Sequence, residues 1–138
     1  MRMADTLHLE IVTPAAVAYS EQVQLVTLPA ADGQIGVFPN HVPLLTRVVP
    51  GEIIVRRDGL EEFLAVGEGL VEITADHVWI VTDMAIAAKD IDEAKVEEAR
   101  QRAAARLRDK ISDEEVATVN ASLARSLAQI RVKKRRRG

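Results

Sequence analysis

The sequence predicts an α+β chain in which an N-terminal antiparallel β-sandwich is followed by a C-terminal antiparallel helical hairpin. Short alternating runs separated by turn residues occupy residues 6–88, which is typical of an all-β sandwich or barrel. After residue 88, Gly and Pro are absent until Gly138, and most residues are strong helix formers. The 138 residues therefore divide into a sandwich domain at 1–88 and a helical domain at 89–138.

The predicted strands alternate apolar and polar side chains. The run TLHLEIV at residues 6–12 does so throughout, with its apolar residues on one face. In QVQLVTL at residues 22–28 the alternation changes phase between Leu25 and Val26, which predicts a β-bulge there. Turn residues follow at regular intervals, and Asp58-Gly59 between two apolar runs predicts a two-residue hairpin loop.

Two helices are predicted after residue 88. The first covers residues 90–111, with Asp90 or Asp92 as its N-cap. The second covers residues 112–132, with Ser112 or Asp113 as its N-cap, and a short link around residues 109–112 makes the pair antiparallel. The apolar stripe predicted for the second helix consists of Val116, Val119, Leu123, Leu127 and Ile130.

The first helix offers mainly alanines to its neighbours. Small side chains bury little apolar area, so the hairpin is expected to be held only weakly to itself and to the sandwich. Because isolated helices of this length are marginally stable in water, the hairpin is the natural candidate for a moving part.

The residue inventory argues against an enzyme and predicts an interaction module. The chain has no cysteine, and its histidines, His8, His41 and His77, lie in three separate segments without the spacing of a metal site. His8 and His77 are expected on polar strand faces, and His41 is expected to make a structural hydrogen bond rather than to act in a catalytic triad. The chain also has no apolar run near the roughly 20 residues of a membrane span.

The charge of the chain is unevenly distributed. The net charge is −3, and residues 131–138 hold six of the 18 Lys and Arg residues and no acid. An acidic body with a basic C-terminal segment favours an acidic partner surface. An alternative is a nucleic-acid or anionic-surface binding module that acts through residues 131–137, although aromatic residues for base stacking are few. A solvated, frayed terminus is the third interpretation.

Residues 33–45, GQIGVFPNHVPLL, resemble the signature of the epsilon subunit of bacterial F-type ATP synthase, which is related to the chloroplast epsilon and mitochondrial delta subunits. The resemblance extends along the chain through LEIVTPAAVAYS, PGEIIVRRDGLEEFLAVGEG and VTDMAIAAKDIDEAKVEEARQRAAARL. The chain has Asn40 where the family usually has Gly, and Asn tolerates a left-handed backbone.

This resemblance implies a sandwich of about ten strands followed by a helical hairpin, in a non-catalytic rotor subunit of the central stalk that couples proton translocation to ATP synthesis. The sandwich would dock on the gamma subunit, and one end would contact the c-subunit ring. Residues 32–45 would form a packed, stiff corner that transmits torque. Gln34 would face the ring, and His41, with Pro39 and Pro43, would lie near gamma.

In this family the hairpin also inhibits ATP hydrolysis, by extending along gamma to an acidic stretch of the beta subunit. The basic residues that suit this contact are Arg125, Arg131, Lys133, Lys134, Arg135, Arg136 and Arg137. The resemblance further implies a peripheral protein at the cytoplasmic face of the bacterial cell membrane, with no required cofactor and no nucleic-acid partner.

Some family members bind regulatory ATP through an [IL]-D-x-x-R-A motif, and the matching stretch here is Ile91-Asp92-Glu93-Ala94-Lys95-Val96. The residues that this resemblance assigns to ATP are Ile91, Asp92, Lys95, Arg102 and Arg125. Lys95 replaces an arginine and cannot reproduce its planar, two-pronged contact. Val96 replaces an alanine, and Gln129 stands where another arginine is expected. The alternative is an ordinary helix start with Asp92 as the acid of the first turn.

Overall fold

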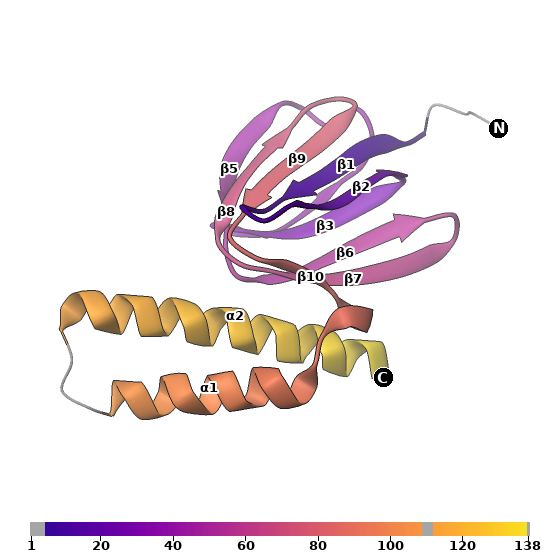
Figure 1. Cartoon of the computed structure of the whole chain (residues 1–138). Helices are drawn as coiled ribbons and strands as arrows, with labels where there is room; N and C mark the ends of the chain where they lie inside the picture. Colours follow the sequence, from indigo (N-terminus) through magenta and orange to yellow (C-terminus); the bar gives the residue numbers. More distant parts are fainter. Residues whose placement is uncertain (1–4, 109–111, 138) are drawn as a thin grey trace.

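The computed structural model describes residues 5–108 and 112–137, which form a β-sandwich followed by two helices (Figure 1). The strands are β1 (Leu7–Val12), β2 (Val17–Val23), β3 (Leu25–Ala30), β4 (Gly33–Val37), β5 (Leu44–Val48), β6 (Gly51–Arg57), β7 (Leu60–Val66), β8 (Gly69–Ile73), β9 (His77–Thr82) and β10 (Ala85–Ala87). A short 3-10 helix, η1 (Ala88–Asp90), leads into α1 (Glu93–Leu107) and α2 (Asp113–Arg137). The predicted fold class is therefore confirmed.

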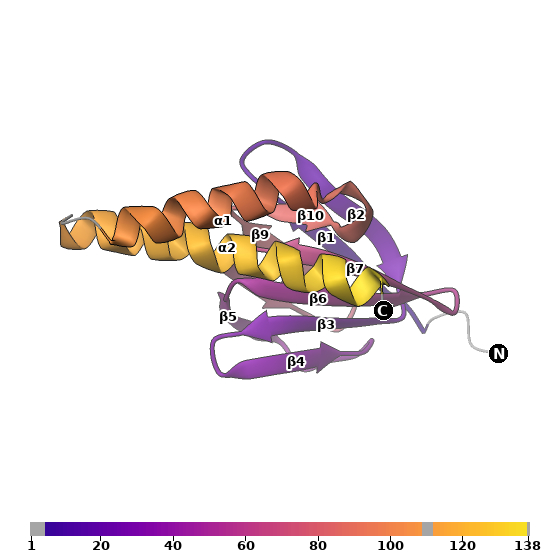
Figure 2. The same cartoon turned by 90° about the horizontal axis from the view of Figure 1, so that it is seen from below.

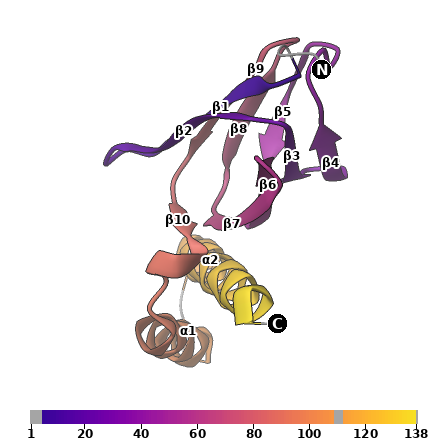
Figure 3. The ribbon, with the colours of Figure 1, turned by 90° about the vertical axis from the view of Figure 1, so that its right-hand side faces the viewer.

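The strands form one continuous ladder in the order β10-β7-β6-β3-β5-β8-β9-β1-β2, with β4 attached to β3. The ladder folds over itself (Figure 3). Its inward faces enclose a core in which Leu9, Ile11, Val55 and Ile80 are fully buried. The expectation of a purely antiparallel sandwich is wrong at one pair, because β1 runs parallel to β9. Parallel neighbours need a long connection between them, and the intervening strands β2–β8 supply it.

The prediction of a β-bulge between Leu25 and Val26 is also wrong. The phase change instead reflects a bend at Gln24, where the chain leaves its pairing with β1 and joins β6 and β4 as a separate strand. The backbone N–H of Gln24 donates to the carbonyl of Arg56 at 2.8 Å, which holds the bend against β6. Val23 and Val26 are both buried, so the bend changes the phase of the alternation by one residue, and a β-bulge would give the same sequence pattern.

The hairpin loop at Asp58-Gly59 is confirmed. Both residues have positive φ, at 54° and 78°, as a two-residue loop between right-twisted strands requires. Asn40 also has a positive φ of 69°, which confirms the expectation of a left-handed backbone there.

The two helices run antiparallel along the side of the sandwich formed by β6, β7 and β10, and α2 is the helix that packs on the strands (Figures 1 and 2). The end of the hairpin at which α1 finishes and α2 starts projects beyond the sheet (Figure 2). Asp92, not Asp90, is the N-cap of α1, because its carboxylate accepts hydrogen bonds from the N–H groups of Ala94 and Lys95. The predicted link falls largely on residues 109–111, which lie outside the described residues.

At the start of α2, Ser112 makes the predicted capping contact. Its Oγ accepts a hydrogen bond from the N–H of Glu115 at 3.2 Å. The apolar stripe predicted for α2 is partly wrong, because Leu127 is 50% exposed while Ala128 and Val132 are buried. The buried side chains of α2 are the small ones of Ser126, Ala128 and Val132. In the described part of the chain, neither helix is long and apolar enough to cross a membrane.

Candidate functional site: the docking face, the hairpin interface and the basic segment

The corner formed by residues 32–45 packs some of its apolar side chains and exposes others, so the expectation of a packed corner is only partly correct. Phe38 is 61% exposed and Val42 is 71% exposed, whereas Val37 is fully buried at the end of β4. The backbone is nevertheless fixed, because the N–H of Asn40 donates to the carbonyl of Ala75 at 2.7 Å, in the turn between β8 and β9. This arrangement holds apolar groups in water at a defined place, which is typical of a binding surface.

A second group of exposed apolar residues continues from this corner along the outer face of β5, β8 and β9. Leu45, Leu70, Trp79 and Val81 are all at least 44% exposed. Leu70 lies directly opposite Val81, and Glu72 lies between Leu45 and Trp79 in the strand register. We call these four residues the docking face.

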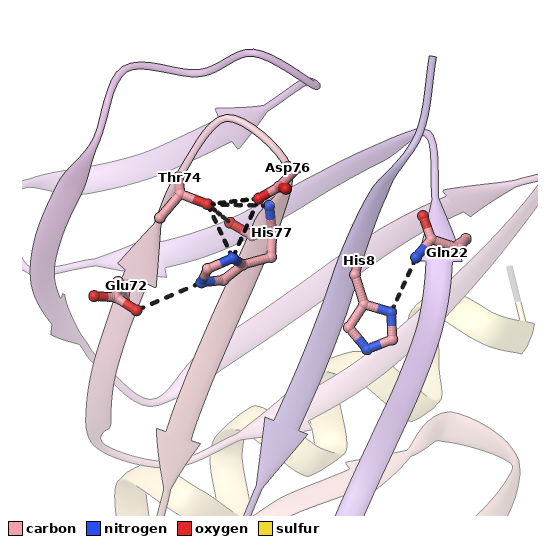
Figure 4. Close-up of polar contacts among 6 residues, drawn as sticks. All are labelled: His8, Gln22, Glu72, Thr74, Asp76 and His77. Atoms are coloured by element: carbon pink, nitrogen blue, oxygen red, sulfur yellow. Dashed lines mark hydrogen bonds and ion pairs between the residues drawn. The ribbon is translucent and has the colours of Figure 1, made fainter. Parts of the chain in front are cut away.

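Polar residues border the docking face on β8, β9, β1 and β2 (Figure 4). His77 contacts Glu72 at 3.4 Å and Thr74 at 3.0 Å, and His8 lies beside Gln22 at 3.2 Å. Both histidines lie on the sheet surface, as expected, and they are neighbours in the β1–β9 register. Within residues 5–108 and 112–137 no group of three or more His, Asp or Glu side chains could hold a metal ion.

The predicted partner-contact residues of the sandwich lie at two separate places. Gln34 is exposed on β4, near a hollow that is also lined by Glu52, Arg131 and Arg135. His41, Pro39 and Pro43 lie at the corner, where Nδ1 of His41 donates to the carbonyl of Val42 at 2.6 Å.

The hairpin interface is a small apolar cluster, separate from the sandwich core. It consists of Ala65, Ala88, Ile91, Val96, Ala128 and Val132. Three of these six residues are alanines, and the larger apolar residues packed against them are only partly buried, so a lightly held hairpin remains a prediction. On α1 itself, hydrogen bonds from Arg100 lower the pKa of Glu97.

Polar contacts flank this cluster on both sides. Arg125 pairs with Asp83 at 3.3 Å, and Nε2 of Gln129 lies 2.9 Å from the sulfur of Met84. Closer to the C-terminus, Nζ of Lys133 donates to the carbonyl of Ala88, and Nε of Arg135 lies 2.8 Å from both carboxylate oxygens of Glu52.

The C-terminal basic residues thus belong to a helix. The α2 helix continues to Arg137, so the interpretation of a frayed terminus is wrong within the described residues. Arg131 and Lys134 are exposed, whereas Lys133 and Arg135 contact the sandwich. The side chains of Arg136 and Arg137 lie outside what the structure describes.

The residues assigned to ATP by resemblance each have a place within the folded chain. Ile91 is buried in the hairpin interface, and the carboxylate of Asp92 caps α1. Arg102 pairs with Glu98 at 2.9 Å, and Arg125 pairs with Asp83 as described above. Lys95 is exposed on the first turn of α1. A nucleotide would have to replace the partners of Asp92, Arg102 and Arg125.

The structure adds a half-buried polar contact that sequence reasoning missed. The hydroxyl of Tyr19 on β2 donates to Glu62 on β7 at 2.9 Å, and Arg57 contacts the same carboxylate. Burial and this hydrogen bond raise the pKa of Tyr19 above its ordinary value. The Glu62 carboxylate likewise raises the pKa of Arg57. Tyr19 and Glu62 are 43 residues apart, so no local sequence pattern predicts their contact.

A β-sandwich with an exposed apolar face, joined to a helical hairpin, is typical of a subunit that binds other proteins. Comparison with family models matches the "ATP synthase, Delta/Epsilon chain, beta-sandwich domain" at residues 6–88 and the "ATP synthase, Delta/Epsilon chain, long alpha-helix domain" at residues 89–134. The chain belongs to the ATP synthase delta/epsilon family, so the resemblance recognised in the sequence is confirmed.

Similar proteins agree with this assignment. The ATP synthase epsilon chain of Halorhodospira halophila is 40% identical over 129 residues, which cover 92% of each chain. A chain in the structure of the Euglena gracilis mitochondrial ATP synthase superposes with a TM-score of 0.77 at 18% identity, covering 95% of this chain and 82% of that one. A chain in the central stalk and c-ring structure of the Tetrahymena thermophila enzyme gives 0.62 at 13% identity, with 92% and 96% covered. At these identities the two structures establish the shared fold.

Proposed function

We propose that this chain is a non-catalytic subunit of the central stalk of an F-type ATP synthase and helps to couple proton translocation to ATP synthesis. The observation that carries the proposal is the match to both family domains, together with a curated epsilon chain that is 40% identical over 92% of the chain. The proposed location is the cytoplasmic face of the bacterial cell membrane, as a peripheral part of the complex.

In this proposal the docking face and the adjoining corner bind the gamma subunit. Fully burying a large apolar side chain contributes about 1.5–3 kcal/mol, so four half-exposed side chains on one rigid sheet supply a useful driving force. Gln34, at the exposed β3–β4 hairpin, is the proposed contact with the polar loops of the c-subunit ring. Its neutral amide offers hydrogen bonds but no ion pair.

A substitution within the docking face tests this contact. We expect Leu70→Asp to weaken binding of the purified chain to gamma at least tenfold, because it replaces an apolar side chain of the docking face with a charge. Leu60→Asp is the matched control, since Leu60 is 70% exposed but lies on β7, outside the docking face. Copurification at a one-to-one ratio is expected for the unchanged chain. A folded chain that does not bind gamma would contradict the proposal.

The hairpin is proposed to inhibit ATP hydrolysis by leaving the sandwich and extending to the beta subunit. The positive charge for an acidic partner surface then comes from Arg125, Arg131, Lys133, Lys134 and Arg135. The attraction is weak for a single exposed ion pair and stronger for a cluster of charges. Removing residues 109–138 is expected to raise ATP hydrolysis by the assembled enzyme and to leave assembly intact. Unchanged hydrolysis would remove the inhibitory role.

We propose that binding to gamma needs no cofactor. Whether regulatory ATP binds at the start of α1 is tested separately. The measurement is a titration of the full-length chain with ATP, followed by NMR of the hairpin amides. Shifts confined to residues near Asp92 and Arg125 would support a nucleotide site there, and unchanged amides would exclude one.

A further inference from the structure

Arg135 connects the last turns of α2 to a buried carboxylate on the sandwich. Nε of Arg135 lies 2.8 Å from both oxygens of Glu52, a residue of β6 that is only 6% exposed. The guanidinium carbon of the same side chain lies 5.9 Å from the centre of the Phe63 ring, within the range of a cation–π interaction. The contact joins residues 83 positions apart and spans the boundary between the two domains.

We propose that Glu52 and Phe63 form an internal acceptor site for Arg135, which holds the hairpin on the sandwich and competes with an external acidic partner for the basic segment. This inference rests on the proposed inhibitory function and names the contact that regulates it. The competing partner is an acidic protein surface, because a second carboxylate is what would replace Glu52 on an arginine.

The competition follows from the geometry of the pair. Nε of Arg135 contacts both Glu52 oxygens and its guanidinium carbon lies over the Phe63 ring, so part of the group that would recognise another carboxylate is already engaged. Arg131 is exposed and Lys133 donates only to a backbone carbonyl, whereas Arg125 pairs with Asp83, a carboxylate that is far more exposed than Glu52. Arg135 is therefore the basic residue whose ion pair with a buried carboxylate must break in the extended state.

The pair is suited to a reversible hold. Glu52 is buried only while α2 covers it, and both ions regain water when the hairpin leaves, which offsets part of the attraction that is lost. Removing Arg135 alone should destabilise the docked hairpin more than removing the charge of Glu52, because it leaves the Glu52 carboxylate covered and without its cation. When the charge of Glu52 is removed, the Arg135 side chain, which is 51% exposed, can still be hydrated, so the loss of stability is smaller.

The test is a double-mutant cycle on the full-length chain, with amide hydrogen exchange of residues 125–135 as the readout. We expect exchange about threefold faster in Glu52→Gln, about tenfold faster in Arg135→Ala, and no faster in the double variant than in Arg135→Ala alone. Arg131→Ala and Glu61→Gln are the matched controls, because each removes the same charge from an exposed position on the same element or its neighbour, and both are expected to exchange as the unchanged chain does.

Core amides of β8 and β9 report whether the sandwich stays folded. If Glu52→Gln speeds their exchange too, Phe63→Leu takes its place in the cycle with Arg135→Ala, since it removes the ring and keeps an apolar side chain. Single effects that multiply in the double variant, or equal effects in the controls, would overturn the acceptor site.

A second measurement separates this inference from the proposed function. In the assembled enzyme, Glu52→Gln is expected to lower ATP hydrolysis severalfold, because the basic segment is released while its own charges are intact. Coupling in the exchange cycle with unchanged hydrolysis would keep the acceptor site and refute the inhibitory function. Absence of coupling overturns the acceptor site whatever the hydrolysis rate.

Discussion

Val132 is the residue whose truncation should most selectively loosen the hairpin. It is fully buried in the hairpin interface, among Ala65, Ala88 and Val96. Val132→Ala removes two methyl groups at about 0.8 kcal/mol each and leaves a small cavity, so we expect the docked position to lose about 2 kcal/mol. Since 1.36 kcal/mol is a factor of ten, the population of undocked hairpin should rise about 30-fold.

Amide hydrogen exchange along α2 measures this change, with the core amides of Val71 and Ile80 as the internal reference for the sandwich. The matched control is Leu127→Ala, which removes a larger side chain from the same helix at a position that is 50% exposed. Its expected effect on docking is below about 0.5 kcal/mol. The reasoning is refuted if Leu127→Ala speeds exchange as much as Val132→Ala, or if Val132→Ala destabilises β8 and β9 equally.

Three further predictions concern the sandwich and the start of α2. Tyr19, the only tyrosine, should show no tyrosinate absorbance as pH rises past its ordinary pKa of 10.0 until the chain unfolds. Because the folded chain holds this proton more tightly than the unfolded chain, the contribution of Tyr19 to stability should be full below about pH 10 and fall above it. Tyrosinate absorbance that appears at the ordinary pKa would contradict this prediction. Gly69→Ala should lower the unfolding free energy by more than about 3 kcal/mol in urea, because its Cβ would collide with the Val81 carbonyl, whereas Gly36→Ala, with open space at its Cβ, should cost about 1 kcal/mol or less. Ser112→Ala should destabilise the first turn of α2 by about 1 kcal/mol, seen as faster exchange at residues 113–116, and unchanged exchange there would argue against the cap.

The features predicted well from the sequence are those that depend on neighbours along the chain. Asp58-Gly59 requires positive φ whatever surrounds it, and Ser112 lies three residues before the N–H that it accepts from. Features that depend on distant segments were missed or misread. The pairing of Glu52 with Arg135 joins residues 83 apart, and the phase change at Leu25 has the same pattern for a bulge as for a change of partner strand.

The exposure of apolar side chains also could not be predicted from local sequence patterns. An apolar residue in a strand is equally consistent with the core and with a surface that another protein covers, so Leu45 and Phe38 could not be assigned to either from the sequence. The same ambiguity placed Leu127 in a buried stripe, although α2 meets the sheet through Ala128 and Val132.

The sequence by itself determined the order of sheet and helices, the Asp58-Gly59 hairpin turn, the pair of candidates for each helix cap and the family, because each depends on local backbone preferences or on a long contiguous motif. Only the tertiary structure decided the parallel pairing of β1 with β9, the exposed docking face and the contact between Arg135 and Glu52. Those features arise when the ladder folds over itself and α2 lies across β6 and β7, which brings together side chains whose sequence separation carries no signal.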